Sequence, residues 1–149
     1  MATTAQDIFE KAMSIMDELS DSGEPDTADT EEYKNRTLFI LNVLGGELYP
    51  YSDTYTMNDP GKRPIMAVIE DFEDEIDLDD YCCRTVMPYG LAAHLWLDEN
   101  PTGASLCQQR YDELKAKLAE GLPRESEDIF DVYGPNGGLH PYNEFGMWW

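Results

Sequence analysis

The sequence predicts a mainly α protein: a small helical bundle of about four helices with a long loop and an extended C-terminal arm. Apolar residues recur at helical spacing in four segments, and Pro- and Gly-rich breaks separate these segments. The last part of the chain has no period at all. At 149 residues the chain is of single-domain size. We therefore expect a helical bundle domain over residues 1–123, with an inserted loop at about 49–64, and an arm over 124–149. A short strand or hairpin is compatible with this pattern.

Two amphipathic helices are expected before residue 49. Thr4 can cap the first, with Asp7 completing an arrangement close to a capping box. Its apolar positions are Ile8, Ala12, Ile15, Met16 and Leu19. The apolar positions of the second helix are Tyr33, Thr37, Ile40, Leu41, Leu44 and Leu48. Gly45-Gly46 weakens its last turns, since each Gly costs about 1 kcal/mol relative to Ala. These glycines favour a close helix crossing or an early end of the helix.

The densest helical periodicity lies between Asp77 and Gly121. We expect a long helix that begins near Leu78 with Asp77 as its cap, and that Pro88 kinks or divides. Its inner positions are predicted to be Cys82, Thr85, Val86, Tyr89, Ala93 and Trp96. Asn100-Pro101-Thr102 breaks this run and opens a last helix that ends at Gly121. The apolar or partly apolar positions of the last helix are Leu106, Cys107, Arg110, Tyr111, Leu114 and Leu118.

The loop at 49–64 is rich in tyrosine and contains one of the few concentrated positive spots. Tyrosines on loops are common at protein interfaces, but packing on the protein's own core is an equally good reading. The residues that we predict for an interface here are Tyr49, Tyr51, Tyr55, Lys62 and Arg63. The apolar run 65–69 that follows has the length of a strand, although it could also be buried coil.

Residues 70–80 carry eight acids in eleven positions. An EF-hand loop needs a central glycine, which is absent here, so we interpret the run as an acidic surface that also favours the N-terminus of the next helix. The predicted acidic surface consists of Glu70, Asp71, Glu73, Asp74, Glu75, Asp77, Asp79 and Asp80. No metal site is predicted.

The charge balance is strongly acidic, with 10 Lys and Arg against 31 Asp and Glu and a formal net charge of -21. This balance disfavours a generic nucleic-acid-binding surface. It fits a basic protein partner, DNA mimicry, or a surface over which DNA passes without sticking. The three cysteines Cys82, Cys83 and Cys107 are an odd number and lie on apolar helix faces, which indicates reduced thiols inside a cell. The chain has neither a secretion signal at its start nor an apolar run long enough for a membrane span.

Motifs of catalysis are missing from the sequence. It has no GxSxG, phosphate-binding loop, HExxH or CxxC, and its only histidines are His94 and His140. We therefore predict that the protein is not an enzyme and uses no cofactor.

The C-terminal arm is aromatic and contains several glycines and prolines. Large apolar side chains usually mark contacts, so the arm either folds back over its own domain or docks on another chain. We favour docking, because aromatic segments with glycine hinges suit it better than core filling. The residues predicted for this contact are Phe130, Tyr133, Tyr142, Phe145, Trp148 and Trp149.

The stretch from Val86 to Leu118 resembles the small neck proteins of tailed bacteriophages and prophages. The residues that carry the resemblance are Pro88, Tyr89, Gly90, Leu91, Ala92, Ala93 and Leu95, then Glu99, Asn100 and Pro101, then Arg110, Tyr111 and Glu113. Together with DIFEKAMSIMDEL near the start, it covers about half of the chain.

The resemblance implies a head–tail connector, also called an adaptor or head completion protein. Such proteins form a homo-oligomeric ring, typically twelvefold, that binds the portal protein and a tail or stopper protein. The ring extends the DNA channel, and double-stranded DNA passes through it without specific binding. The implied location is the neck of the virion, assembled in the cytoplasm of the bacterial host. The alternatives are an acidic DNA-mimic inhibitor of a host DNA-binding enzyme, and a small phage tail or assembly protein.

Overall fold

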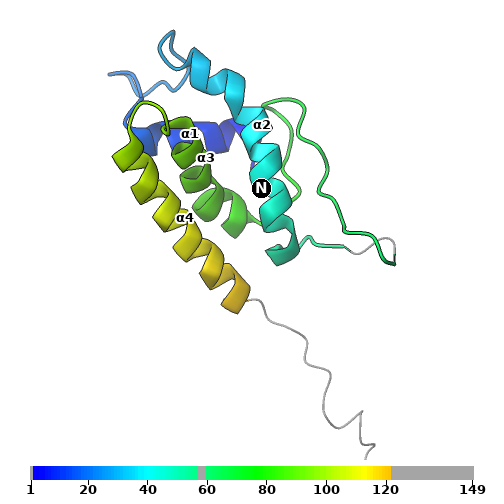
Figure 1. Ribbon diagram of the computed structural model, residues 1–149. Coiled ribbons are helices and arrows are strands. Elements are labelled where there is room, and N and C mark those ends of the chain that lie inside the picture. Colours follow the sequence, from blue (N-terminus) through cyan, green and yellow to red (C-terminus); the bar gives the residue numbers. More distant parts are fainter. Residues whose placement is uncertain (1, 57–59, 122–149) are drawn as a thin grey trace, which may run out of the picture.

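A computed structural model describes residues 2–56 and 60–121 of the chain and confirms the mainly helical fold (Figure 1). Within the described residues the only β pairing is an isolated bridge between Thr4 and Glu75. The elements in chain order are α1 (Ala5–Met16), α2 (Glu31–Leu48), a 3-10 turn η1 (Tyr49–Tyr51), a π-helical turn η2 (Cys82–Val86), α3 (Met87–Leu95) and α4 (Pro101–Gly121).

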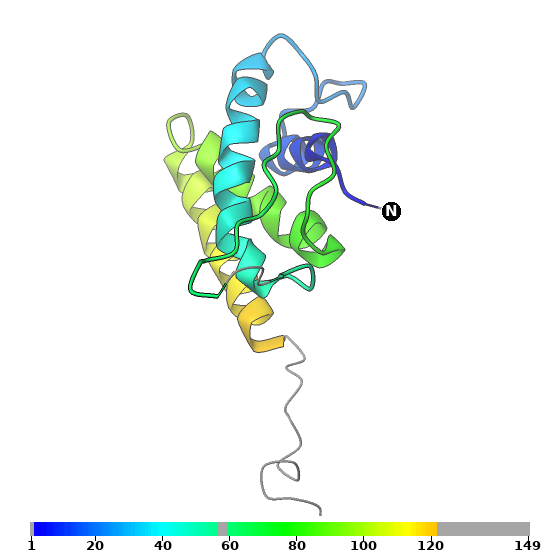
Figure 2. The ribbon, with the colours of Figure 1, turned by 90° about the vertical axis from the view of Figure 1, so that its right-hand side faces the viewer.

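Helix α3 is the centre of the bundle, because α1, α2 and α4 all pack against it. Figures 1 and 2 show α4 running along one side of α3, with α1 crossing near one end of the bundle. A helix with neighbours on several sides has to be apolar nearly all round. The buried residues of α3 are Met87, Pro88, Gly90, Leu91, Ala92, Ala93 and Leu95.

The start of α1 is fixed by its own cap and by a distant segment. The capping box is confirmed: the Asp7 backbone N–H donates to Thr4 Oγ1 over 3.3 Å, and the Thr4 backbone N–H donates to Asp7 Oδ2 over 3.0 Å. The next amides donate to carbonyl oxygens of the acidic stretch, Gln6 to Phe72 over 2.9 Å and Ala5 to Asp74 over 3.2 Å. The first turn of α1 therefore has partners for amides that a helix leaves unpaired.

The buried faces of α1 and α2 follow the predicted stripes with three differences, the first being Ile15, which is only partly buried. Leu19 is exposed because α1 ends at Met16, where Asp17 takes a left-handed conformation with φ of 58°. Ile40 is only partly buried. Gly45 does not mark a helix crossing or an early helix end: α2 continues to Leu48, and the close neighbour is Met66 of the non-helical 65–69 segment, whose Cε would lie 2.3 Å from a Cβ on Gly45.

The cap of the third helical run is Asp79 instead of the predicted Asp77. Asp79 Oδ1 accepts a 2.8 Å hydrogen bond from the Cys82 amide. The predicted division at Pro88 is confirmed: the π turn η2 ends where α3 begins, and the Met87 amide donates to the Cys82 carbonyl. Proline has no N–H to donate, and a wider turn just before it is one way to accommodate this loss.

Helix α4 begins one residue earlier than the sequence suggested. Asn100 Oδ1 accepts a 3.0 Å hydrogen bond from the Gly103 amide, and Pro101 occupies the first helical position, where its missing N–H costs nothing. Thr102 is therefore inside the helix.

The segment 65–69 runs along α2 without forming a strand. The Ile69 N–H donates to Asn42 Oδ1, and the Ile69 carbonyl accepts from Asn42 Nδ2, each over 2.9 Å. The Asn42 side chain thus takes the place of a strand partner. Met66 and Ile69 are buried, whereas Ile65 and Val68 are exposed. The strand reading is therefore wrong and the buried-coil reading is right for two of the five positions.

Candidate interaction surfaces

The loop tyrosines lie against the protein's own core. Tyr49 is 3% exposed, its hydroxyl lies 3.3 Å from Thr56 Oγ1, and its ring centroid lies 5.5 Å from that of Tyr55. Tyr51 and Tyr55 are partly buried against the same core. The structure therefore corrects the interface assignment for Tyr49, because a side chain already enclosed by its own chain has little area left for a partner.

The positive spot of the loop is at the surface, since Lys62 and Arg63 are both exposed. The six predicted contact residues of the arm, Phe130, Tyr133, Tyr142, Phe145, Trp148 and Trp149, lie outside the described residues.

The acidic stretch 70–80 alternates between inward apolar and outward charged residues. Ile76 and Leu78 are buried, Phe72 packs edge-on against Phe9 with centroids 5.9 Å apart, and their neighbours face water. The exposed acids are Glu70, Asp71, Glu73, Glu75, Asp77 and Asp80. The stretch thus combines buried apolar anchors with six exposed carboxylates.

Two of the eight predicted acids, Asp74 and Asp79, accept hydrogen bonds from backbone amides of their own chain. Asp74 Oδ2 accepts 2.9 Å hydrogen bonds from the amides of Asp71 and Glu70, and these bonds lower the pKa of Asp74. Asp79 caps η2 and also accepts a 3.2 Å bond from the Asp53 amide. A carboxylate held by backbone amides stabilises its own segment, so Asp74 and Asp79 are positioning residues more than surface charges.

An exposed apolar surface on α2 and the segment beside it was not predicted. Phe39 is 76% exposed and Val43, one turn later, is 46% exposed. On the neighbouring 65–69 segment, Ile65 is 86% and Val68 is 69% exposed. We call these four residues the α2 apolar surface. The i, i+4 spacing of Phe39 and Val43 outside the buried stripe was the signal that could have revealed it.

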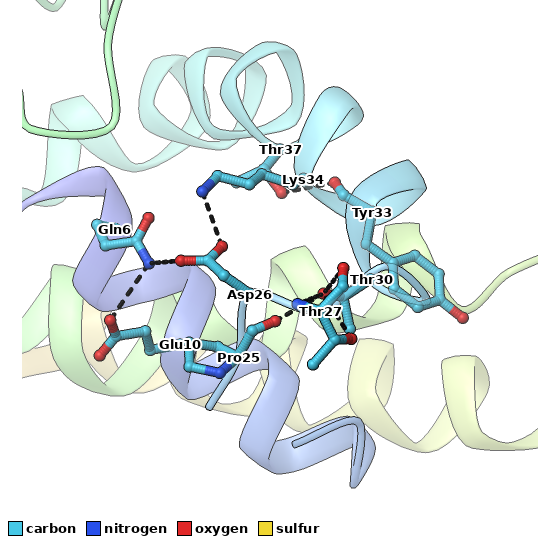
Figure 3. Close-up of polar contacts among 9 residues, drawn as sticks. All are labelled: Gln6, Glu10, Pro25, Asp26, Thr27, Thr30, Tyr33, Lys34 and Thr37. Atoms are coloured by element: carbon cyan, nitrogen blue, oxygen red, sulfur yellow. Dashed lines mark hydrogen bonds and ion pairs between the residues drawn. The ribbon is translucent and has the colours of Figure 1, made fainter. Parts of the chain in front are cut away.

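A polar network joins α1 to α2 through the turn that connects them (Figure 3). Asp26 accepts from Lys34 Nζ over 2.7 Å and from Gln6 Nε2 over 3.2 Å. The buried Thr30 hydroxyl donates to the Pro25 carbonyl over 2.6 Å. Lys34 Nζ also lies 5.0 Å from the ring centroid of Phe72. The hydrogen bonds link Gln6, Asp26 and Lys34 to one another at the surface, which fits a structural role for the network.

Two tyrosines cross-link helices through carboxylates. Tyr111 Oη of α4 donates to Glu47 Oε2 of α2 over 2.9 Å, and Tyr33 of α2 donates to Glu99 before α4. Burial, followed by the bond to its carboxylate partner, raises the pKa of each tyrosine. Both phenols therefore stay protonated and act as donors at neutral pH.

The thiols of Cys82, Cys83 and Cys107 are free and buried. Burial, then the charge of Asp79, raises the pKa of Cys83 to about 12. A thiol in this state is a poor nucleophile. In the described ranges 2–56 and 60–121, no group of three or more His, Cys, Asp or Glu side chains could hold a metal ion. No helix among these residues is long and apolar enough to cross a membrane.

Comparisons with known proteins give no relative from which a function could be taken: no family model, no curated protein and no solved structure matches the chain. The surfaces described above are therefore the basis for any functional assignment.

Proposed function

We propose that the protein is a structural virion protein, a head–tail connector that forms a ring between portal and tail and extends the DNA channel. The proposal rests on the sequence resemblance and on one observation, the α2 apolar surface. A soluble helical bundle that leaves Phe39 and Ile65 more than three-quarters exposed has an apolar area of the kind that contacts between proteins bury.

The charge supports the same proposal. A formal charge of -21 repeated around a ring would line a DNA channel with carboxylates, and DNA would pass such a wall without binding. The six exposed acids of residues 70–80 would supply carboxylates for that wall. The same acids would serve the alternative, a DNA mimic that occupies a basic DNA-binding enzyme.

Electron microscopy of the chain mixed with the portal protein encoded near it tests the proposal. We expect rings seated on the portal. A matched pair of variants links the ring to the apolar surface: Phe39→Gln with Ile65→Gln should abolish ring formation. Leu97→Gln with Leu106→Gln, which changes two side chains of similar exposure (62% and 64%), should not.

The contrary result is equally clear. Tight stoichiometric capture of a basic DNA-binding enzyme, without rings on the portal, would reject the connector in favour of the DNA mimic. The position of the gene provides a cheaper check, because a connector gene is expected just after the portal and capsid genes.

The arm provides a second test. Deleting residues 137–149 should leave the helical bundle folded and abolish assembly, because the deletion removes most of the arm's aromatic side chains and keeps every residue of the core described in residues 2–56 and 60–121. Circular dichroism reports the fold and electron microscopy the assembly. An unfolded truncated chain would contradict the docking role of the arm.

A further inference from the structure

A groove of about 370 Å³ lies between α1, the η2–α3 run and α4. Three cations line it, Lys11 from α1, Arg84 from η2 and Arg110 from α4, together with the apolar side chains of Ile15, Pro88 and Tyr89. A second hollow of about 450 Å³ lies beside it along α1 and shares Lys11, Ser14 and Arg84, but its lining also contains the acids Asp7 and Glu10. We call the first hollow the cationic groove.

The composition of the cationic groove is opposite to that of the chain. Acids outnumber Lys and Arg by 31 to 10 over the whole sequence, yet the lining of this groove holds three cations and no acid. Its cations come from three elements that are far apart in sequence. Tertiary packing has therefore gathered positive charge and apolar surface at one place on an otherwise acidic molecule, which is a complementary site for an acidic segment that also carries apolar side chains.

The internal pairs of these cations do not block such a partner. Arg110 meets Glu113 over 3.4 Å and Arg84 meets Asp80 over 3.9 Å, and the side chains of both arginines are nearly half exposed. Exposed ion pairs of this kind contribute roughly 0–1 kcal/mol, so a partner carboxylate in the groove can compete with them.

A segment with the complementary composition exists in the chain itself. Residues 125–133 read ESEDIFDVY and combine four acids with Ile129, Phe130, Val132 and Tyr133. They begin four residues after Gly121, the last described residue. We propose that residues 125–133 of one copy dock in the cationic groove of a second copy. The acids pair with Lys11, Arg84 and Arg110, and the aromatic side chains pack on Ile15 and Tyr89.

The position of the chain end favours a second copy over the same chain. Helix α4 ends at the part of the bundle remote from α1, as Figures 1 and 2 both show. Arg110 lies eleven residues before Gly121, which is about 17 Å along the helix axis, and Lys11 belongs to α1 beyond it. The described chain therefore ends well away from its own groove, at the opposite end of α4 from α1.

The proposed contact also addresses how copies of so acidic a chain can associate. Two molecules that each carry -21 repel unless the contact buries cations of one against acids of the other. This inference rests on the self-association proposed above and specifies its charge-paired contact.

Binding of a labelled peptide tests the inference. The probe is a fluorescein-labelled peptide of residues 123–136, and the receptor is the full chain with Glu127→Gln, Asp128→Asn, Phe130→Ala and Tyr133→Ala, so that its own arm does not compete. Fluorescence anisotropy should show saturable binding. Adding Lys11→Glu and Arg110→Glu to the receptor should weaken binding by about tenfold or more, as loss of close charge pairs does.

Two controls separate the groove from general charge. Adding Lys62→Glu and Arg63→Glu changes the net charge by the same amount at exposed residues outside the groove lining and should leave the affinity within about twofold, since distant exposed charges are screened by salt. A peptide with Glu127→Lys and Asp128→Lys should regain affinity for the Lys11→Glu, Arg110→Glu receptor, which also shows that this receptor is folded.

The inference is overturned if the peptide does not bind, if both receptor pairs weaken it equally, or if a labelled DNA duplex binds the groove in its place. The connector proposal is tested separately by rings on the portal. Peptide binding without rings would reject the connector and keep the docking contact, whereas rings without peptide binding would do the reverse.

Discussion

Three glycines in the helices provide a graded test of the packing, and Gly90 is the critical one. It lies in α3 where α4 and α2 come closest: a Cβ there would be 2.9 Å from two ring carbons of Tyr111 and 3.1 Å from Leu44 Cδ1. Ordinary carbon–carbon contacts are about 3.5–4.0 Å. The Tyr111 ring is buried and its hydroxyl is bonded to Glu47, so it cannot move aside without loss.

We expect Gly90→Ala to destabilise the protein by about 1 kcal/mol. Overpacking a core costs about 1–3 kcal/mol, whereas alanine in place of glycine in a helix gains only about 1 kcal/mol. Gly46→Ala is the matched control, because nothing lies within 4 Å of its Cβ position, and it should stabilise by about 0.5–1 kcal/mol. Gly45→Ala should be nearly neutral, since it meets the flexible end of Met66.

Urea unfolding followed by circular dichroism measures all three variants. With a slope of about 2 kcal/mol per molar urea, the midpoints of Gly90→Ala and Gly46→Ala should differ by about 1 M. If Gly90→Ala were as stable as Gly46→Ala, the close packing of α3 against Tyr111 and Leu44 would be wrong.

Three further predictions concern caps, pH and thiols. Asp79→Ala should cost about 1 kcal/mol in the same urea assay because the Cys82 amide loses its acceptor; Asp77→Ala is the control, and an equal loss would restore Asp77 as the cap. The hydrogen bond from the Thr4 amide holds the pKa of Asp7 below its usual value. Asp7 therefore contributes stability above its unfolded pKa that is lost as the pH falls through its lower folded pKa. The cost of Asp7→Asn, measured by urea unfolding at several pH values, should be largest near neutrality and shrink below a pH of about 4; a cost independent of pH would contradict this. Mass spectrometry after iodoacetamide treatment at pH 8 should show Cys83 unmodified in the folded chain and modified in urea, and rapid labelling of the folded chain would refute its burial.

The helices were largely predictable because a 3.6-residue period reports which face is buried, although Leu106 and Arg110 of the stripe predicted for α4 are exposed. The stripe of α2 that includes Leu41 and Leu44 is buried as expected. Local signals failed where several residues could serve the same role. From the sequence, Asp77 and Asp79 are equally good helix caps. A tertiary contact favours Asp79, because its amide also donates to Ser52 Oγ over 2.9 Å.

The candidate surfaces were harder to predict for a related reason. Nothing local distinguishes an exposed Phe39 from one that a neighbouring segment covers. The cationic groove is formed by Lys11, Arg84 and Arg110, whose proximity depends on how α1, η2 and α4 pack. Composition indicated that positive charge is scarce, but only the packed structure shows where the scarce charge is concentrated.

The hydrogen bonds between α1 and the acidic stretch have a consequence for folding kinetics. The amides of Ala5 and Gln6 bond to carbonyl groups more than sixty residues further along the chain. A helix of 12 residues such as α1 is marginal in isolation, and contacts across so long a loop form late. Helix α1 should therefore become stable only after residue 76 has left the ribosome. The first helix to be synthesised is thus among the last to become stable.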